Sequence, residues 1–171
     1  MPLPQFFTHR HATAPLLILT TTLKTFFFTH LFLTHIYTLK PTRGPSMLPT
    51  LEVFGDSVLI SRYFRRGRDV KVGDVVSFDS VVVSGEEVIK RVVGCQGDFV
   101  ILQDEVGRGE KMLQVPEGHC WVVGDNLSAS RDSRHFGPMP MAVIKGKVVA
   151  KVFPWSERKW IDDGLRPVET Q

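Results

Sequence analysis

Val88-Ile89-Lys90-Arg91-Val92-Val93-Gly94 is the stretch of sequence that decides the fold. Its β-branched residues favour an extended strand, and two cations occupy its centre. Side chains alternate between the faces of a strand, so Lys90 shares one face with two valines, whereas Arg91 lies on the other face. The alternation alone leaves open which of the two cations points inward.

The chain on either side of this strand contains further short β-prone segments, separated by Gly-Asp and Pro-Glu-Gly turns. No stretch beyond residue 43 keeps a helical period over three turns. The sequence therefore predicts a mainly β domain, a small sandwich or folded barrel. Its strands are expected at residues 56–61, 74–78, 87–93, 99–102, 119–123 and 143–153.

Residues 1–43 differ from the rest, because they contain no acidic residue, no glycine and ten threonines. The apolar stretch 16–39 is long enough to cross a bilayer as a helix, although Lys24 and two histidines interrupt it. A transmembrane anchor, an uncleaved targeting segment and an amphipathic helix on a membrane surface remain alternatives. The composition thus divides the chain into an N-terminal targeting or membrane segment, 1–43, and a globular domain, 44–171.

Charge and cysteine content exclude some classes of protein. The formal net charge is +3, and both signs are interspersed after Glu52. Only residues 62–68, Arg-Tyr-Phe-Arg-Arg-Gly-Arg, combine cations with aromatic rings, so we expect no nucleic acid partner. Cys95 and Cys120 either pair or remain free thiols, and the spacing of Cys and His predicts no metal site.

A candidate nucleophile lies in residues 44–51, Gly-Pro-Ser-Met-Leu-Pro-Thr-Leu. The turn-forming residues around Ser46 keep this segment out of a regular helix or a central strand and leave the hydroxyl accessible. Lys90 is the candidate base, since burial in an apolar strand lowers the pKa of an ammonium group toward neutrality. Ser-Lys pairs are a known variant of the nucleophile-base arrangement. Each residue by itself is equally typical of a turn serine or of an edge-strand lysine.

A third element is the polar loop 124–138, which follows the apolar run 120–123. Asp132 and Arg134 are expected to pair, and Asn126, Ser130 and Ser133 supply hydrogen bonds that hold the loop without a metal. A loop of this length after a strand is typical of a site held on a scaffold.

Together these elements resemble, in order and content, the type I signal peptidases, which use a Ser-Lys pair to remove targeting peptides. The resemblance rests on residues 46–51, 73–76, 90–98 and 124–134. It implies a signal-peptidase-like β fold with one N-terminal membrane-anchoring helix. It also implies Ser46 as nucleophile and Lys90 as general base, with Ser130 orienting the ammonium group. The pair Asp132–Arg134 would brace the site.

The resemblance further implies that Asp125 and Asn126 support the site and that the backbone N–H of Ser46 meets the oxyanion. Some bacterial members add a serine hydroxyl two residues before the nucleophile, but Gly44 occupies that position here. The second oxyanion donor is therefore open.

Within the family, the lysine base and the run 118–126, Gly-His-Cys-Trp-Val-Val-Gly-Asp-Asn, are most similar to the mitochondrial inner membrane branch. That likeness implies an enzyme of the inner membrane whose catalytic domain faces the intermembrane space. The likeness implies that this enzyme needs no cofactor. Its partners would be precursor proteins carrying sorting signals, a related second subunit and membrane lipid. The alternatives are a catalytically silent or partner-stabilising subunit, a bacterial-type signal peptidase, and a soluble self-cleaving Ser-Lys regulator.

Overall fold

The chain divides into two units, Met1–Ile36 and Tyr37–Gln171. The computed structural model describes residues 13–103 and 110–164 of the 171. The outer ends of both parts expected from composition, residues 1–12 and 165–171, lie outside the described residues.

The first unit contains one helix, α1 (Thr13–His35), in its described part. Its segment Ala14–Phe32 is long and apolar enough to cross a membrane, and none of it is buried in the protein. Two of its threonines, Thr20 and Thr25, donate their hydroxyls to carbonyls one turn earlier, at 3.0 and 2.9 Å. These bonds satisfy polar groups that hydrocarbon could not, so the threonine content is compatible with a lipid environment.

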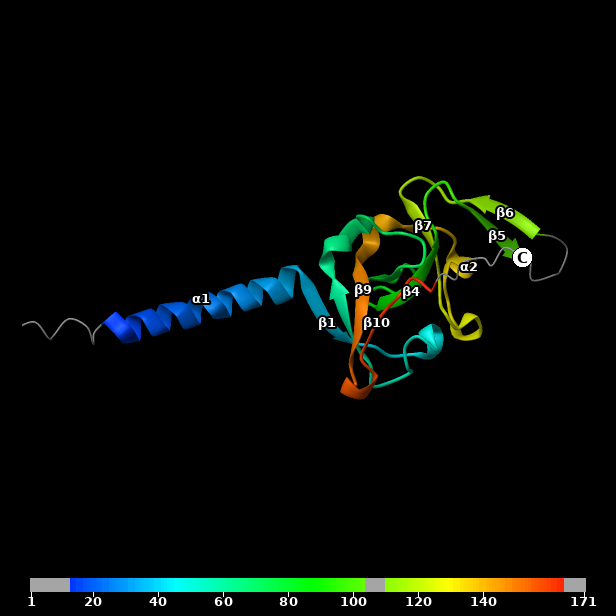
Figure 1. The fold of residues 1–171 in the computed structure, drawn as a ribbon. Helices are drawn as coiled ribbons and strands as arrows, with labels where there is room; N and C mark the ends of the chain where they lie inside the picture. The colour runs from blue at the N-terminus through cyan, green and yellow to red at the C-terminus, as the bar shows by residue number, and fades with distance from the viewer. Residues whose placement is uncertain (1–12, 104–109, 165–171) are drawn as a thin grey trace, which may run out of the picture. The chain divides into compact units, whose positions relative to one another are not determined.

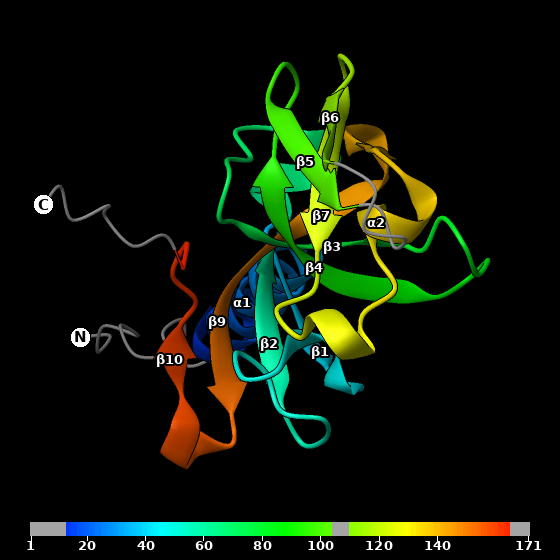
Figure 2. The same ribbon diagram turned by 90° about the vertical axis from the view of Figure 1, so that its right-hand side faces the viewer.

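An antiparallel sheet that curls on itself makes up the described part of the second unit (Figures 1 and 2). Its strand order is β1-β2-β9-β3-β4-β7-β8, β10 adds to β9, and β5 and β6 form a separate hairpin. The strands are β1 (Tyr37–Pro41), β2 (Ser57–Ser61), β3 (Val75–Asp79), β4 (Glu87–Gly94), β5 (Phe99–Gln103), β6 (Glu110–Gln114), β7 (His119–Val123), β8 (Met139–Pro140), β9 (Ile144–Phe153) and β10 (Lys159–Trp160). The short helices are η1 (Pro45–Met47), η2 (Arg62–Gly67), η3 (Leu127–Ala129), α2 (Ser133–Phe136), η4 (Met141–Val143) and η5 (Trp155–Glu157).

The prediction of a mainly β fold with one N-terminal apolar helix is confirmed, and all six predicted strands are present. The sequence did not reveal β1, β6, β8 and β10. Strand β1 was hidden because its Tyr-Thr-Leu segment continues the apolar composition of the helix. The helix ends at His35, so residues 37–39 of the expected membrane stretch 16–39 lie in the sheet. Strands β8 and β10 are two residues each, too short to show alternation.

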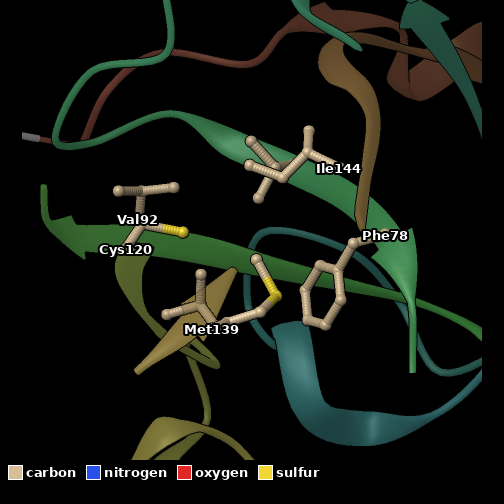
Figure 3. Packing of buried hydrophobic residues seen from close by; sticks show 7 residues of the cluster. Phe78, Val92, Cys120, Met139 and Ile144 are labelled. Atoms are coloured by element: carbon tan, nitrogen blue, oxygen red, sulfur yellow. The ribbon is translucent and has the colours of Figure 1, made fainter. Parts of the chain in front are cut away.

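Two hydrophobic clusters fill the curled sheet. Phe78, Val92, Cys120, Met139 and Ile144 belong to the first, and their side chains, which come from β3, β4, β7, β8 and β9, lie close together (Figure 3). The second cluster contains buried side chains from η1, the following loop, and strands β2, β3 and β9. Its buried members are Met47, Leu51, Val58, Ile60, Val75 and Val148. The second cluster therefore reaches from the sheet to the segment that carries the candidate nucleophile.

Candidate active site

The nucleophile segment is a single turn fixed by its own apolar side chains. Ser46 is the middle residue of η1, and the next residue, Met47, is only 3 % exposed in the second cluster. Leu51 donates its backbone N–H to the carbonyl of Met47 at 2.9 Å and is itself buried. Because Met47 and Leu51 are both buried in the core, the half-buried Ser46 is held in a fixed position next to β4.

Lys90, at the centre of β4, faces the nucleophile. Its side chain is buried, at 5 % exposure, and Nζ lies 2.8 Å from Ser46 Oγ and 3.1 Å from the carbonyl of Ile89. Of the two cations that periodicity could not rank, the structure buries Lys90 and leaves Arg91 partly exposed. Burial lowers the pKa of the Lys90 ammonium, and the negative charges of Asp132 and Asp125 offset that effect only in part.

Asp132 and Arg134 form the ion pair that the sequence predicted. Arg134 Nε lies 2.8 Å from Asp132 Oδ1, and the aspartate side chain is fully buried. The same carboxylate accepts the backbone N–H of Gly124 at 2.9 Å and that of Arg134 at 3.3 Å, which caps α2. Burial opposes ionisation, but the hydrogen bonds outweigh it, so the pKa of Asp132 is lowered.

Ser130 sits beside this pair but does not make the expected hydrogen bond to the lysine. Its side chain is buried at 6 % exposure, and its Oγ has no hydrogen-bond partner among the described residues. It lies close enough to the Asp132 carboxylate to favour the charged form. The structure therefore brings Ser130 to the site with a buried hydroxyl still available.

Gly124 explains how Ser130 comes so near the nucleophile segment. A Cβ at residue 124 would lie 2.3 Å from Ser130 Oγ and 2.5 Å from the carbonyl oxygen of Ser46. No side chain fits in that space. The absence of a side chain at Gly124 therefore allows the polar loop and the nucleophile segment to approach each other.

A second arginine–carboxylate pair supports the other side of the site, and sequence reasoning missed its cation. Arg91 donates Nε and Nη2 to Asp125 at 2.8 and 2.9 Å, and Thr50 donates its hydroxyl to the same carboxylate. Burial opposes ionisation here too, but the bonds from Arg91 and Thr50 outweigh it and lower the pKa of Asp125. The only available signal was that Arg91 occupies the strand face opposite the candidate base.

Asn126 fastens the polar loop to the nucleophile segment. Its backbone N–H donates to the carbonyl of Ser46 at 3.0 Å, and its side-chain amide donates to the carbonyl of Pro45 at 3.2 Å. Asp125 and Asn126 thus both contact the segment 44–51, one through Thr50 and one through the backbone.

A cleft of 260 Å³ opens beside Ser46 and Lys90. Its walls come mainly from residues 40–44, 51–52 and 87–90, with Met47 and Ile60. Gly44 lines it with a φ of 102°, a backbone conformation that a serine would adopt only under strain. This conformation favours glycine at position 44, which supplies no side-chain hydroxyl to the cleft.

The sequence left the state of the two cysteines open and predicted no metal site. Cys95 and Cys120 are both free thiols, and burial raises the pKa of Cys120 to about 12, which keeps it protonated. Over residues 13–103 and 110–164, no three His, Cys, Asp or Glu side chains are arranged to hold a metal ion.

Comparison with known proteins identifies the family of the chain. The model of the family "Signal peptidase, peptidase S26" matches residues 11–107 and 103–155. The chain belongs to the signal peptidase S26 family. The S26 match covers all four motifs on which the resemblance rested, and membership makes the protein a peptidase of the signal peptidase type.

Curated relatives of this S26 peptidase carry the name of the branch that its motifs most resemble. Mitochondrial inner membrane protease subunit 1 of Schizosaccharomyces pombe is 36 % identical over 145 residues, covering 84 % of this chain and 90 % of the relative. The subunit 1 proteins of Saccharomyces cerevisiae and Homo sapiens are 40 % and 35 % identical, covering 72 % and 67 % of this chain and 71 % and 68 % of theirs. A solved signal peptidase I from Enterococcus faecalis V583 aligns with 25 % identity and a TM-score of 0.40, over 47 % of this chain and 97 % of that one.

Proposed function

We propose that this S26 peptidase is a serine endopeptidase in which Ser46 attacks the peptide bond and Lys90 removes the proton from its hydroxyl. The observation that carries the proposal is the 2.8 Å separation between Lys90 Nζ and Ser46 Oγ, with the lysine 5 % exposed. A general base must lie within hydrogen-bonding reach of its proton, and its pKa must approach the working pH. Burial of the lysine lowers its pKa, which is the direction that the second condition requires.

In the proposed reaction, neutral Lys90 accepts the hydroxyl proton while Ser46 Oγ bonds to the substrate carbonyl carbon. The oxyanion of the tetrahedral intermediate meets the backbone N–H of Ser46. The ammonium of Lys90 then returns the proton to the leaving amine, and the C–N bond breaks to give an acyl-enzyme. A water molecule, deprotonated by the same amine, hydrolyses the ester and regenerates Ser46.

The remaining residues have supporting tasks in this proposal. In this proposal the hydroxyl of Ser130, which is buried and has no hydrogen-bond partner among the described residues, accepts from the lysine ammonium and orients it. Asp132 with Arg134 braces the polar loop internally, and Asp125 with Arg91 fixes the loop to β4. Asn126 orients the carbonyl of Ser46 and therefore the peptide plane that follows the nucleophile.

We further propose that the substrates are precursor proteins delivered to the mitochondrial intermembrane space, from which the enzyme removes sorting peptides beside a related second subunit. The names of the relatives as subunits of a mitochondrial inner membrane protease support this assignment. Helix α1 would anchor the chain in the inner membrane, with the sheet domain in the intermembrane space. An extended substrate would lie in the cleft between residues 40–44 and β4, adding as a strand.

The mechanism is tested with the purified full-length protein in detergent and a precursor peptide. Ser46→Ala and Lys90→Ala are each expected to abolish cleavage. Ser84→Ala and Lys71→Ala, which change exposed residues outside the cleft, serve as controls and should cleave normally. Cleavage by either active-site variant at the wild-type rate would disprove the Ser-Lys mechanism.

Compartment and orientation are tested separately with organelles. In intact mitochondria an added protease should leave the sheet domain uncut, whereas osmotic opening of the outer membrane should expose it. Protection after opening would place the domain in the matrix and contradict the proposed orientation.

A further inference from the structure

A second hollow, of 640 Å³, lies next to the catalytic cleft and shares Lys40, Ile60 and Glu87 with it. We call it the basic pocket, because five basic but only two acidic residues line it. Its remaining walls are mostly apolar. The charged lining residues are Lys40, Arg62, Arg65, Arg66, Lys145, Asp79 and Glu87.

The acidic residues of the basic pocket are already engaged by its lysines. Lys145 Nζ lies 2.6 Å from Asp79 Oδ1 and 3.4 Å from Glu87 Oε2, and Lys40 also pairs with Glu87. Arg65 and Arg66 are exposed, and neither has a carboxylate partner in the part of the chain that the structure describes. The two exposed arginines thus add positive charge that no described carboxylate of the hollow pairs with.

The two arginines stand on a turn that is fixed in place. Within η2 the backbone leaves the helical conformation at Arg65 (φ −58°, ψ 142°) and becomes left-handed at Arg66 (φ 61°). The next residue, Gly67, packs so closely that an added Cβ would lie 2.6 Å from the Cβ of Met141 in η4. Two other residues of η4 line the pocket. The turn and the pocket wall are thus one packed unit, which presents the guanidinium groups with little freedom of the backbone.

We propose that the basic pocket binds the phosphate group of an anionic phospholipid. A guanidinium group can donate two parallel hydrogen bonds to two oxygens of one phosphate, whereas an ammonium group acts as a point charge. Arg65 and Arg66 therefore suit a phosphodiester. The apolar walls, which include Ala142 and Val143, suit the glycerol and the first carbons of the acyl chains.

The position of the pocket along the chain favours a lipid over a soluble anion. Thr38 lines the pocket and follows His35, the last residue of α1, by three positions. Three extended residues span about 10 Å at most, so only a short stretch of chain separates the last residue of the helix from a residue of the pocket wall. Clusters of Lys and Arg next to a membrane helix are typical binding sites for anionic lipids. The inference uses only the membrane-spanning role of α1 from the proposed function and is independent of the peptidase chemistry.

Isothermal titration of the full-length protein in an uncharged, phosphate-free detergent tests this assignment. Three probes are titrated: dihexanoyl phosphatidylglycerol, dihexanoyl phosphatidylcholine and inorganic phosphate. We expect saturable one-to-one binding of the phosphatidylglycerol, with both other probes at least roughly tenfold weaker. The double variant Arg65→Gln/Arg66→Gln should weaken phosphatidylglycerol binding about 10- to 30-fold, in line with the usual contribution of two cations near a lipid surface.

Arg68→Gln is the matched control, since Arg68 stands next to the turn but stacks on the ring of Tyr63 at 5.4 Å and does not line the pocket. The Arg68→Gln protein should bind the phosphatidylglycerol with wild-type affinity, and the melting temperatures of all variants should equal that of the wild type. Equal binding by the double variant and the wild type, or equal loss in Arg68→Gln, overturns the site. Inorganic phosphate or phosphatidylcholine binding as tightly as the phosphatidylglycerol overturns the lipid assignment. Binding requires no hydrolysis, so a Ser46→Ala protein gives the same answer if the peptidase proposal fails.

Discussion

Replacing Lys90 by methionine is expected to destroy the proposed base and yet stabilise the fold. Methionine keeps the unbranched stem of the lysine inside the strand environment, where the side chain is 5 % exposed. It removes an ammonium whose charged form is disfavoured by burial. No buried carboxylate loses its partner, because Asp125 keeps Arg91 and Asp132 keeps Arg134.

The size of the gain follows from opposing contributions. Exchanging buried charged groups for apolar residues of similar volume is often stabilising, by about 1–4 kcal/mol. Here the hydrogen bonds from Nζ to Ser46 Oγ and to the carbonyl of Ile89 are lost, at about 1 kcal/mol each. We therefore expect the free energy of unfolding to rise at pH 7, by up to about 2 kcal/mol. For a domain of this size, that is up to roughly 8 °C in melting temperature.

The pH dependence provides a sharper test than the gain itself. Because the folded pKa of Lys90 lies below its ordinary value of 10.5, the unfolded chain binds this proton more tightly than the folded chain. Wild-type stability therefore rises, relative to the methionine variant, as the pH increases from the folded pKa toward 10.5. The advantage of the variant should be largest at neutral pH and should shrink at alkaline pH.

Unfolding is followed by the fluorescence of Trp121, which is 4 % exposed, in detergent at several pH values from 7 to 10. The exchange Lys71→Met, at an exposed position, controls for loss of one surface charge. A methionine variant less stable than the wild type at pH 7, or an advantage independent of pH, would refute the reasoning that burial depresses this lysine.

Three further predictions concern catalysis and the packing of the site. The kcat/KM of the wild type should rise with pH through a value below 10.5, the depressed pKa of Lys90, and a flat profile in peptide assays would contradict a lysine base. Gly124→Ala should lower kcat by about 100-fold, because a Cβ would displace the nucleophile segment. Gly94→Ala is the control: its Cβ has its closest contact at 3.0 Å, so its kcat should fall far less. An equal fall of kcat in both variants would disprove the steric account. Arg91→Met should destabilise the domain by about 3 kcal/mol in denaturant titrations, since it leaves Asp125 without its bidentate partner. The unpaired carboxylate should also raise the pKa of Lys90 and shift the pH–rate profile to higher pH. An unchanged profile would count against coupling of that carboxylate to the lysine.

The sequence predicted those parts of the fold that depend on local pattern. Alternation and turn residues located β4 and β7 to within a residue, because each of these strands buries side chains in the core. Strand β1 was not predictable, since its apolar residues continue the composition of α1 and its pairing with β2 is a property of the folded sheet. The helix was expected to extend to residue 39, but the chain turns into the sheet at Tyr37.

The candidate site shows the same division between local and long-range information. The pair Asp132–Arg134 was predictable, because two positions in one loop separate its members. The pair Arg91–Asp125 joins residues 34 positions apart, and nothing in either neighbourhood identifies the partner. For the same reason, periodicity could not decide between Lys90 and Arg91. That decision depends on which face of β4 the remaining sheet covers, and only the assembled fold supplies it.

The two arginine–carboxylate pairs have a common consequence for Lys90. Bare carboxylates near an ammonium raise its pKa and hold it charged, which is the opposite of what a general base needs. Asp125 and Asp132 both act on Lys90 in this direction, but each is bound by an arginine of its own, Arg91 or Arg134. The site therefore gains the geometric support of two carboxylates while much of their field is cancelled locally. Burial can then dominate, and the lysine beside Ser46 has the lowered pKa that the proposed mechanism requires.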